Sequence, residues 1–181
     1  VLDQVVMAVP SFFIGILLTC VFGLVLHVFR PGSFDAVQND PVQLLVYMLF
    51  PALSIAIPRI AMTVKMLRSS ILEQMSQDYI RTAYSRGNDR DGVLWSHALR
   101  NALIPVVTFV AVSVAEMVAG SIVVEQIFSV PGIGRLLLTS IGSRDFPVVQ
   151  AIVVILALWV VVVNFIADVL YQYIDPRIRL N

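Results

Sequence analysis

Long apolar stretches alternate with polar segments along this chain of 181 residues. Residues 5–29 and residues 146–167 contain no Asp, Glu, Lys or Arg, whereas residues 42–64 contain one and residues 101–125 contain two. A helix needs about 20 predominantly apolar residues to cross a bilayer, and each of these stretches is at least that long. The pattern therefore predicts about four transmembrane helices in an all-α, polytopic membrane helix bundle.

Two of these stretches carry a charged residue at depth. Arg59 follows a proline in the second stretch, and we expect it either to form a pair or to extend towards the interface. Glu116 lies inside the third stretch, where an ionisable group is costly and is by default a functional candidate. Thr108 and Gly120 share its stripe, so these three residues are candidates for lining a translocation path. A buried hydrogen-bonded pair is the alternative for Glu116.

The main polar interruption covers residues 66–100. Apolar residues recur every four positions at its start, which predicts that the second helix continues as an amphipathic helix. Gly87 suits a helix stop, and Asn88 or Asp89 can cap a new short helix. The stretch therefore predicts a hairpin. Its candidate contact residues for a partner are Thr82, Ala83, Gly87, Val93, Leu94, Trp95 and Leu99.

From the residues alone, two interpretations of this hairpin are equally good. Small residues at the bend let another protein approach, and Trp95 is a suitable anchor for an apolar pocket. The alternative is an ordinary connecting loop whose arginines meet anionic lipid headgroups.

A second polar segment, residues 125–147, contains a Pro-Gly-Ile-Gly turn at residues 131–134. The apolar helix predicted after the turn, residues 133–141, is too short to span. We expect it to be a re-entrant or interfacial segment.

Basic residues set the expected orientation. One side of the predicted topology carries eight of them, and the other side carries three, Arg30, Arg135 and Arg144. Arg59 is left out of this count. Because cytoplasmic loops carry the excess of Lys and Arg, residues 66–100 and the C-terminus are expected in the cytoplasm.

Composition agrees with a membrane protein. Hydrophobic residues make up 59% and charged residues 13%, with a mean hydropathy of +0.89, whereas soluble domains have about 25% charged residues. The net charge is zero, so nothing indicates a nucleic-acid partner. The chain begins with Val1 and no basic segment precedes the first apolar stretch. We therefore expect residues 1–181 to be a single domain and the C-terminal part of a longer chain.

Motifs for catalysis are missing from the sequence. There is no GxxxxGK[ST] phosphate loop and no HExxH motif, and Cys20 is the lone cysteine. His27 and His97 fall on opposite sides of the predicted membrane, so no metal site is expected. The chain is predicted not to be an enzyme. A rival hypothesis is an ion- or proton-coupled transporter or channel that uses Glu116 and Asp168, and a third is a scaffold.

Several separated motifs resemble those of a known family. The stretch Tyr79-Ile-Arg-Thr-Ala-Tyr-Ser-Arg-Gly87 and the stretch His97-Ala-Leu-Arg-Asn-Ala-Leu-Ile-Pro105 resemble the "EAA" loop of ABC-transporter permeases. Glu125-Gln-Ile-Phe-Ser-Val-Pro-Gly-Ile-Gly-Arg-Leu and the terminal Asp175-Pro-Arg-Ile-Arg resemble the dipeptide/oligopeptide/nickel branch of binding-protein-dependent importers. The motif order is more similar to the first permease of the pair, the DppB/OppB type.

Two departures leave the individual contacts open. Where the general motif begins Glu-Ala-Ala, this chain has Arg81-Thr82-Ala83, and of the later Ile-x-Leu-Pro only Leu99 matches. Gly87 is the residue carried over most safely.

The resemblance implies half of a membrane channel in the cytoplasmic (inner) membrane of a prokaryote. Such permeases pair with a second permease, and two cytosolic ABC ATPases dock on their loops and use the ATP, so no cofactor is implied for this chain. An extracytoplasmic solute-binding protein would lie near Pro131, Gly132 and Gly134. The resemblance also implies two further N-terminal helices. It leaves the substrate open among peptides, nickel and other small solutes.

Overall fold

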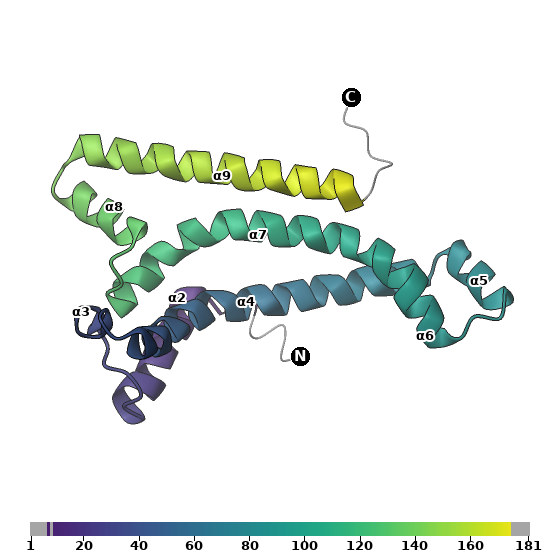
Figure 1. The fold of residues 1–181 in the computed structure, drawn as a ribbon, viewed down its shortest axis with the longest axis horizontal. Helices are drawn as coiled ribbons and strands as arrows, with labels where there is room; N and C mark the ends of the chain where they lie inside the picture. The colour runs from purple at the N-terminus through teal and green to yellow at the C-terminus, as the bar shows by residue number, and fades with distance from the viewer. Residues whose placement is uncertain (1–6, 8, 175–181) are drawn as a thin grey trace. The chain divides into compact units, whose positions relative to one another are not determined.

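The computed structural model describes residue 7 and residues 9–174, without the side chains of residues 119–120 and 170–174. Every element over the described residues is a helix (Figure 1). The fold class is therefore confirmed as all-α. The terminal motif at Asp175 lies outside the described residues.

The first apolar stretch forms a shorter helix than its pattern predicts. Helix α2 (Ser11–Leu18) continues directly into the π-helix η1 (Thr19–Val25). Pro10 is extended immediately before α2, with φ −62° and ψ 146°, because a proline has no N–H to give to a preceding turn and disfavours helix in the residue before it. His27 then has φ 53°. The pattern predicted a span over residues 5–29 with Pro10 near its start, whereas the described helix covers residues 11–25.

The second stretch forms one long helix. After a short helix, α3 (Phe34–Val37), helix α4 (Pro41–Met75) runs for 35 residues and includes both prolines of the second span. Asp40 caps it, because its Oδ1 accepts hydrogen bonds from the backbone N–H groups of Val42 at 3.0 Å and Gln43 at 3.3 Å. A helix of this length measures about 50 Å, which exceeds the apolar core of about 30 Å. The predicted continuation of the helix past residue 64 is therefore confirmed.

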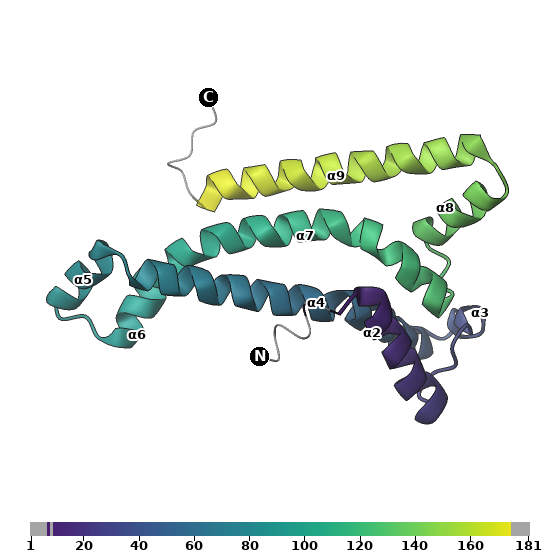
Figure 2. The ribbon, with the colours of Figure 1, turned by 180° about the vertical axis from the view of Figure 1, so that it is seen from behind.

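Two further long helices follow. Helix α7 (Leu99–Phe128) contains the third apolar stretch, and helix α9 (Phe146–Ile174) contains the fourth. Between them, α8 (Ile133–Gly142) makes an angle of 85° with the end of α7 (Figure 2). Within the described residues, three helices are long and apolar enough to cross a membrane, or up to four if the bent pair counts as one span. The chain is therefore a multi-pass membrane protein.

The contacts divide the chain into two compact units. The first combines Ala115–Val161 with the described residues up to Ala61. Its core is a cluster of buried side chains in which the Phe29 and Phe50 rings stack with centroids 4.4 Å apart. The division describes contacts, and a single domain over residues 1–181 stays a prediction.

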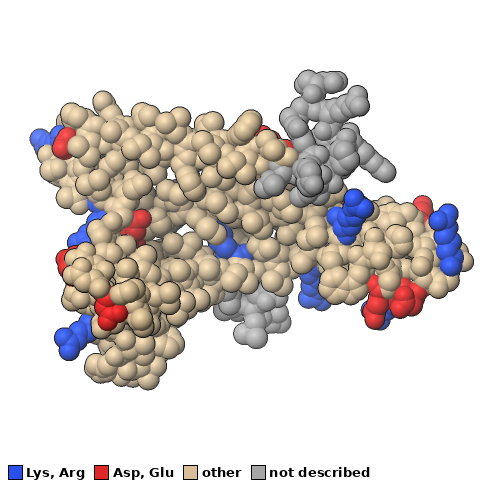
Figure 3. All heavy atoms as spheres, viewed as in Figure 1, with Lys and Arg blue, Asp and Glu red and all other residues tan. Residues whose placement is uncertain are grey.

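The second unit combines Met62–Val114 with the described residues from Val162 onwards. Its core holds together a hairpin of short helices, α5 (Asp78–Ser85) and α6 (Arg90–Val93), which lie against each other (Figure 1). The surface over α9 is almost free of charged atoms between its ends, whereas charged atoms gather over the hairpin (Figure 3). This contrast is the one expected for a helix in lipid and a loop in water.

Candidate functional site

The turn of the hairpin is built by three consecutive residues. Gly87 has φ 82°, which glycine adopts without the steric cost that other residues incur. The Asn88 side chain donates from Nδ2 to the Ala83 carbonyl at 3.0 Å and so satisfies the end of α5. Asp89 is the N-cap of α6, because its Oδ1 accepts from the Gly92 N–H at 3.1 Å. The predicted stop at Gly87 and the predicted cap at Asp89 are both confirmed.

Some of the predicted contact residues form the core of the hairpin instead of its surface. Ala83 is 6% exposed and Val93 is fully buried, and they pack with Ile80 and Ala98. These side chains cannot reach a partner unless the hairpin opens. Their role in the described structure is to hold α5 against α6.

The other predicted residues divide between the surface and its edge. Thr82, Gly87 and Trp95 are exposed, with Trp95 at 68%, whereas Leu94 and Leu99 are half-buried. A large aromatic side chain left in this position is available for an apolar partner surface. Trp95 lies in the π-helix η2 (Leu94–Ala98), which joins α6 to α7 without a break. No sequence signal separated this π-helical turn from an ordinary helix.

A polar network at the base of the hairpin was not predicted. The Tyr79 hydroxyl donates to Oε1 of Gln74 at 2.7 Å and accepts from Nδ2 of Asn101 at 3.1 Å. These bonds tie α5 to the end of α4 and to the start of α7. Because 22 positions separate Tyr79 from Asn101, periodicity could not reveal them.

The charged residues of the second and third spans form an ion pair. Nη1 of Arg59 lies 2.8 Å from Oε2 of Glu116, and the two side chains are 25% and 58% exposed. The pairing foreseen for Arg59 is therefore present. More than half of the Glu116 side chain is exposed in the isolated chain. The pair is therefore not a buried one within this chain.

The contacts of the other candidate residues for a translocation path say less about their role. Thr108 is half-buried, and its hydroxyl donates to the Ile104 carbonyl of its own helix at 3.3 Å. Gly120 lies in α7, but its surroundings fall outside the described residues. Asp168, the carboxylate of the rival hypothesis, is exposed on α9. Whether any of them lines a path stays a prediction.

The turn between α7 and α8, residues 125–135, is held by side chains, and we call it the elbow. Glu125 accepts the backbone N–H of Arg135 at Oε2 and the Ser121 hydroxyl at Oε1, both at 2.9 Å. The Arg135 guanidinium donates to the Ser129 carbonyl at 2.8 Å, and Ser129 itself has φ 54°. The Tyr47 hydroxyl donates to the Phe128 carbonyl at the end of α7.

Both glycines of the predicted outer contact face inward. A Cβ at Gly132 would overlap the Glu125 carboxylate, and one at Gly134 would lie 2.6 Å from Cγ1 of Ile122. Gly134 is buried and Gly132 is half-buried, whereas Pro131 is exposed. The glycines therefore provide room inside the elbow, and of the three residues only Pro131 is fully on the surface.

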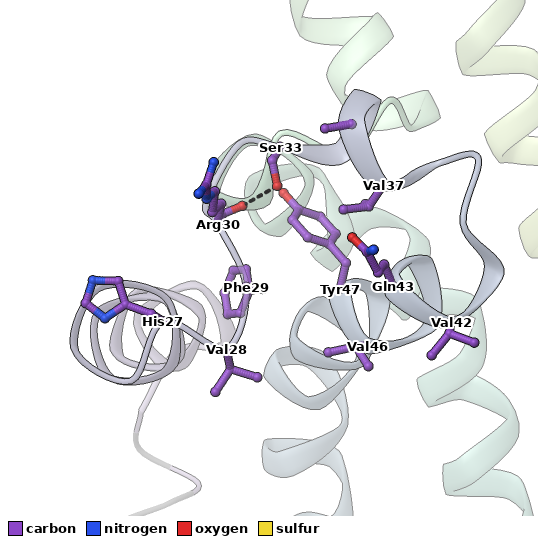
Figure 4. Close-up of a pocket in the computed structure, with 11 residues that line it drawn as sticks. His27, Val28, Phe29, Arg30, Ser33, Val37, Val42, Gln43, Val46 and Tyr47 are labelled. Atoms are coloured by element: carbon purple, nitrogen blue, oxygen red, sulfur yellow. Dashed lines mark hydrogen bonds between the residues drawn. The ribbon is translucent and has the colours of Figure 1, made fainter.

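A cavity of about 490 Å³ lies between the end of η1 and the start of α4 (Figure 4). In this view the Tyr47 ring stands between Phe29 on one side and Val37 and Gln43 on the other. Arg30 lies at its edge, where its carbonyl accepts from the Ser33 hydroxyl at 2.8 Å. Sequence reasoning placed no cavity here, because its walls come from three separate segments.

Metal ligands do not gather in the described part of the chain, where no group of three or more His, Cys, Asp or Glu is placed to hold an ion. The expectation of a metal-free chain stays a prediction.

The helices, the hairpin and the bent pair together define a polytopic α-helical membrane protein. The chain belongs to the family of binding-protein-dependent transport system inner membrane components, whose family model matches residues 2–180. The resemblance drawn from its motifs is thereby confirmed, and the chain belongs to a family of transport components.

Relatives support the peptide branch of that resemblance. The chain is 40% identical over 175 residues to the oligopeptide transport system permease protein AppB of Bacillus subtilis, covering 96% of the chain and 55% of the relative. It is 40% identical over 174 residues to a putative peptide transport system permease protein of Brucella abortus, with 96% and 55% covered. It is 45% identical over 133 residues to the dipeptide transport system permease protein DppB of Escherichia coli, with 74% and 39% covered. The chain spans about half the length of the first two.

Proposed function

We propose that this chain is a membrane-spanning permease subunit of an ABC importer that moves peptides inward across the cytoplasmic membrane of a prokaryote. The observation that carries the proposal is the similarity, at 40–45% identity, to permeases named for oligopeptide and dipeptide transport. Nickel or a related small solute is the second substrate class of the branch. The energy comes from ATP hydrolysis on two separate ABC ATPase subunits, and a second permease subunit completes the path.

The hairpin is the element that we propose couples the two processes. Its excess of basic residues favours the cytoplasmic side, and its own buried core supports its acting as a rigid body. A rigid hairpin passes a movement of the ATPase into α4 and α7 instead of absorbing it. Thr82, Gly87 and Trp95 form the contact surface, with Leu94 and Leu99 at its edge, while Ala83 and Val93 support it from within.

The ion pair is the part that we propose faces the translocation path. A charged side chain in lipid is costly, so the exposed part of Glu116 favours a position against water or another subunit. Thr108 and Gly120 share the sequence stripe of Glu116 along α7, and we propose that they line the same path. The outer contact with the solute-binding protein is placed at the elbow, at Pro131 with Gly132 and Gly134 behind it.

Trp95→Ala tests the coupling role. In proteoliposomes that contain both permeases, the ATPases and the binding protein, we expect this variant to lower binding-protein-stimulated ATP hydrolysis and uptake of a labelled tripeptide by about tenfold or more, as for an interface hot spot. The matched control is Trp159→Ala, which changes the other tryptophan of the chain. Trp159 lies on α9 and is 42% exposed, and its variant should keep both activities.

Two results would contradict the proposal. One is peptide uptake driven by a proton gradient in vesicles without the ATPases, which would favour the proton-coupled alternative. The other is an equal loss of activity in both tryptophan variants with normal ATPase co-purification, which would remove the special role of the hairpin.

A further inference from the structure

The elbow contains a helix cap that comes from another helix. The first N–H groups of any α-helix lack partners within the helix and need acceptors. In α8 the N-cap residue is Gly132, which has no side chain to provide one. The Glu125 carboxylate, at the end of α7, accepts the N–H of Arg135 in the first turn of α8 instead. The cap thus joins two helices that meet at 85°.

Neighbouring residues contact this carboxylate on more than one side. The Ser121 hydroxyl, one turn earlier in α7, lies 2.9 Å from its other oxygen and 2.8 Å from the Val118 carbonyl. The missing Cβ of Gly132 provides the space that the carboxylate fills. At Gly132 the backbone φ is −103°, which any residue adopts, so the glycine is required for space and not for conformation.

The side of α8 that faces away from Glu125 carries exposed apolar side chains. Ile133 is 46% exposed, Leu136 is 52% exposed and Pro131 is exposed beside them. A hollow of about 440 Å³ lies among these residues. The direction in which they point is set by the angle between α8 and α7, and therefore by whatever fixes that angle.

We infer that Glu125 is a positioning residue. By capping α8 from the end of α7, it fixes the orientation of α8, and so sets the affinity of the exposed side of α8 (Pro131, Ile133 and Leu136) for the solute-binding protein. The inference rests on the proposed function, because it takes the binding protein as the partner of this face. Arg135 and Tyr47 hold the backbone of the elbow between the two helices.

The first test separates capping from charge. Loss of an N-cap costs about 1 kcal/mol, which corresponds to about a fivefold effect. In the complete importer, we expect Glu125→Ala to raise the binding-protein concentration for half-maximal ATPase stimulation about fivefold, with the maximal rate unchanged. Glu125→Gln should stay close to the unaltered protein, because its amide oxygen still accepts the Arg135 N–H and its NH₂ group can donate to Ser121.

The second test uses the contact between Glu125 and Gly132. Gly132→Ala alone should raise the half-maximal concentration by a similar factor of about five, because its Cβ displaces the capping carboxylate. In the Glu125→Ala background the same substitution has nothing to displace. The double variant should therefore match the single variants, whereas independent effects would multiply to about 25-fold.

A structural measurement accompanies both tests. Spin labels at Val123 on α7 and Leu138 on α8, both exposed, in a Cys20→Ser background report the angle of the elbow directly. We expect a narrow distance distribution in the unaltered protein and in Glu125→Gln, and a broad one in Glu125→Ala and Gly132→Ala.

The outcomes are decisive in each direction. An unchanged half-maximal concentration or distance distribution in Glu125→Ala overturns the inference, and so does a Glu125→Gln variant that behaves like Glu125→Ala. If the binding protein fails to stimulate even the unaltered importer, the proposed function is wrong. The inference is then wrong as well, because it takes the binding protein as the partner of α8. If the unaltered importer responds normally but the Glu125 and Gly132 variants do not behave as expected, the inference is overturned and the proposed function stands.

Discussion

The hairpin and the elbow are both polar turns between apolar helices, and they use glycine for different reasons. At the hairpin, Gly87 has φ 82° and open space where a Cβ would stand. At the elbow, Gly134 has no unusual φ, but Ile122 leaves no room for a Cβ. The hairpin encloses an apolar core of its own, whereas Phe128 of the elbow belongs to the larger apolar core of the first unit. The elbow is also held by a carboxylate, a guanidinium and a phenol.

This difference fits the roles proposed for the two turns. An apolar core of its own makes the hairpin a separate body, and the hydrogen bonds of Tyr79 tie that body to the ends of α4 and α7. Directional hydrogen bonds fix an angle between two helices, which suits a surface that must be presented in one orientation. The predictions below test whether the two turns can be perturbed separately.

The largest effect is expected at the hairpin turn. Gly87→Trp should abolish co-purification of the ATPases while membrane insertion stays normal, because a bulky side chain then occupies the proposed docking surface. Gly87→Asn is the control, since asparagine tolerates a positive φ far better than other non-glycine residues. It should retain most of the association.

Either variant can contradict this prediction. Normal ATPase co-purification by Gly87→Trp would exclude docking at this turn. Loss of co-purification in Gly87→Asn as well would show that the bulk of the tryptophan is not what blocks docking.

An effect of intermediate size is expected inside the hairpin. Ile80 is 1% exposed, and truncation of such a side chain to alanine costs about 2–5 kcal/mol through lost burial and the cavity left behind. Ile80→Ala should therefore speed amide hydrogen exchange in α5 and α6 by at least about 30-fold in nanodiscs. Exchange in α8 should not change.

The α8 amides serve as the internal control for that measurement. Faster exchange in α8 as well would mean that the two turns share one cooperative unit. In that case the hairpin could not be described as a separate body.

The sequence predicts the hairpin better than the elbow, for a physical reason. The stop at Gly87 and the cap at Asp89 depend on residues within about one helical turn, and both follow from local chemistry. The bond of Tyr47 to the Phe128 carbonyl joins residues 81 positions apart, which no periodic pattern reveals. The three long helices α4, α7 and α9 were predicted for the same local reason, because the length and spacing of apolar residues determine them, whereas the first stretch forms a shorter helix than predicted.

The candidate site was predicted only in part. The motif around Ala83 and Val93 marked the hairpin but could not distinguish its proposed contact surface from its core, because both kinds of residue are apolar or small. The Glu125 cap could be sought in the sequence as an acidic residue a few positions before a Pro-Gly-x-Gly turn. Arg59 and Glu116 were recognised as charges at depth, and their pairing needed the relative rotation of α4 and α7.

The smallest effects are expected from removing one hydroxyl in each turn. Tyr47 is 1% exposed, so Tyr47→Phe leaves the Phe128 carbonyl without this donor in a buried place, at a cost of about 1–3 kcal/mol. Tyr79 is 37% exposed, and water can replace its hydroxyl, so Tyr79→Phe should cost about 0.5 kcal/mol. Hydrogen exchange should accordingly rise about tenfold at the elbow in the first variant and about twofold at the hairpin base in the second. The reverse order would show that the hairpin, too, depends on directional bonds, and the distinction between the two turns would be lost.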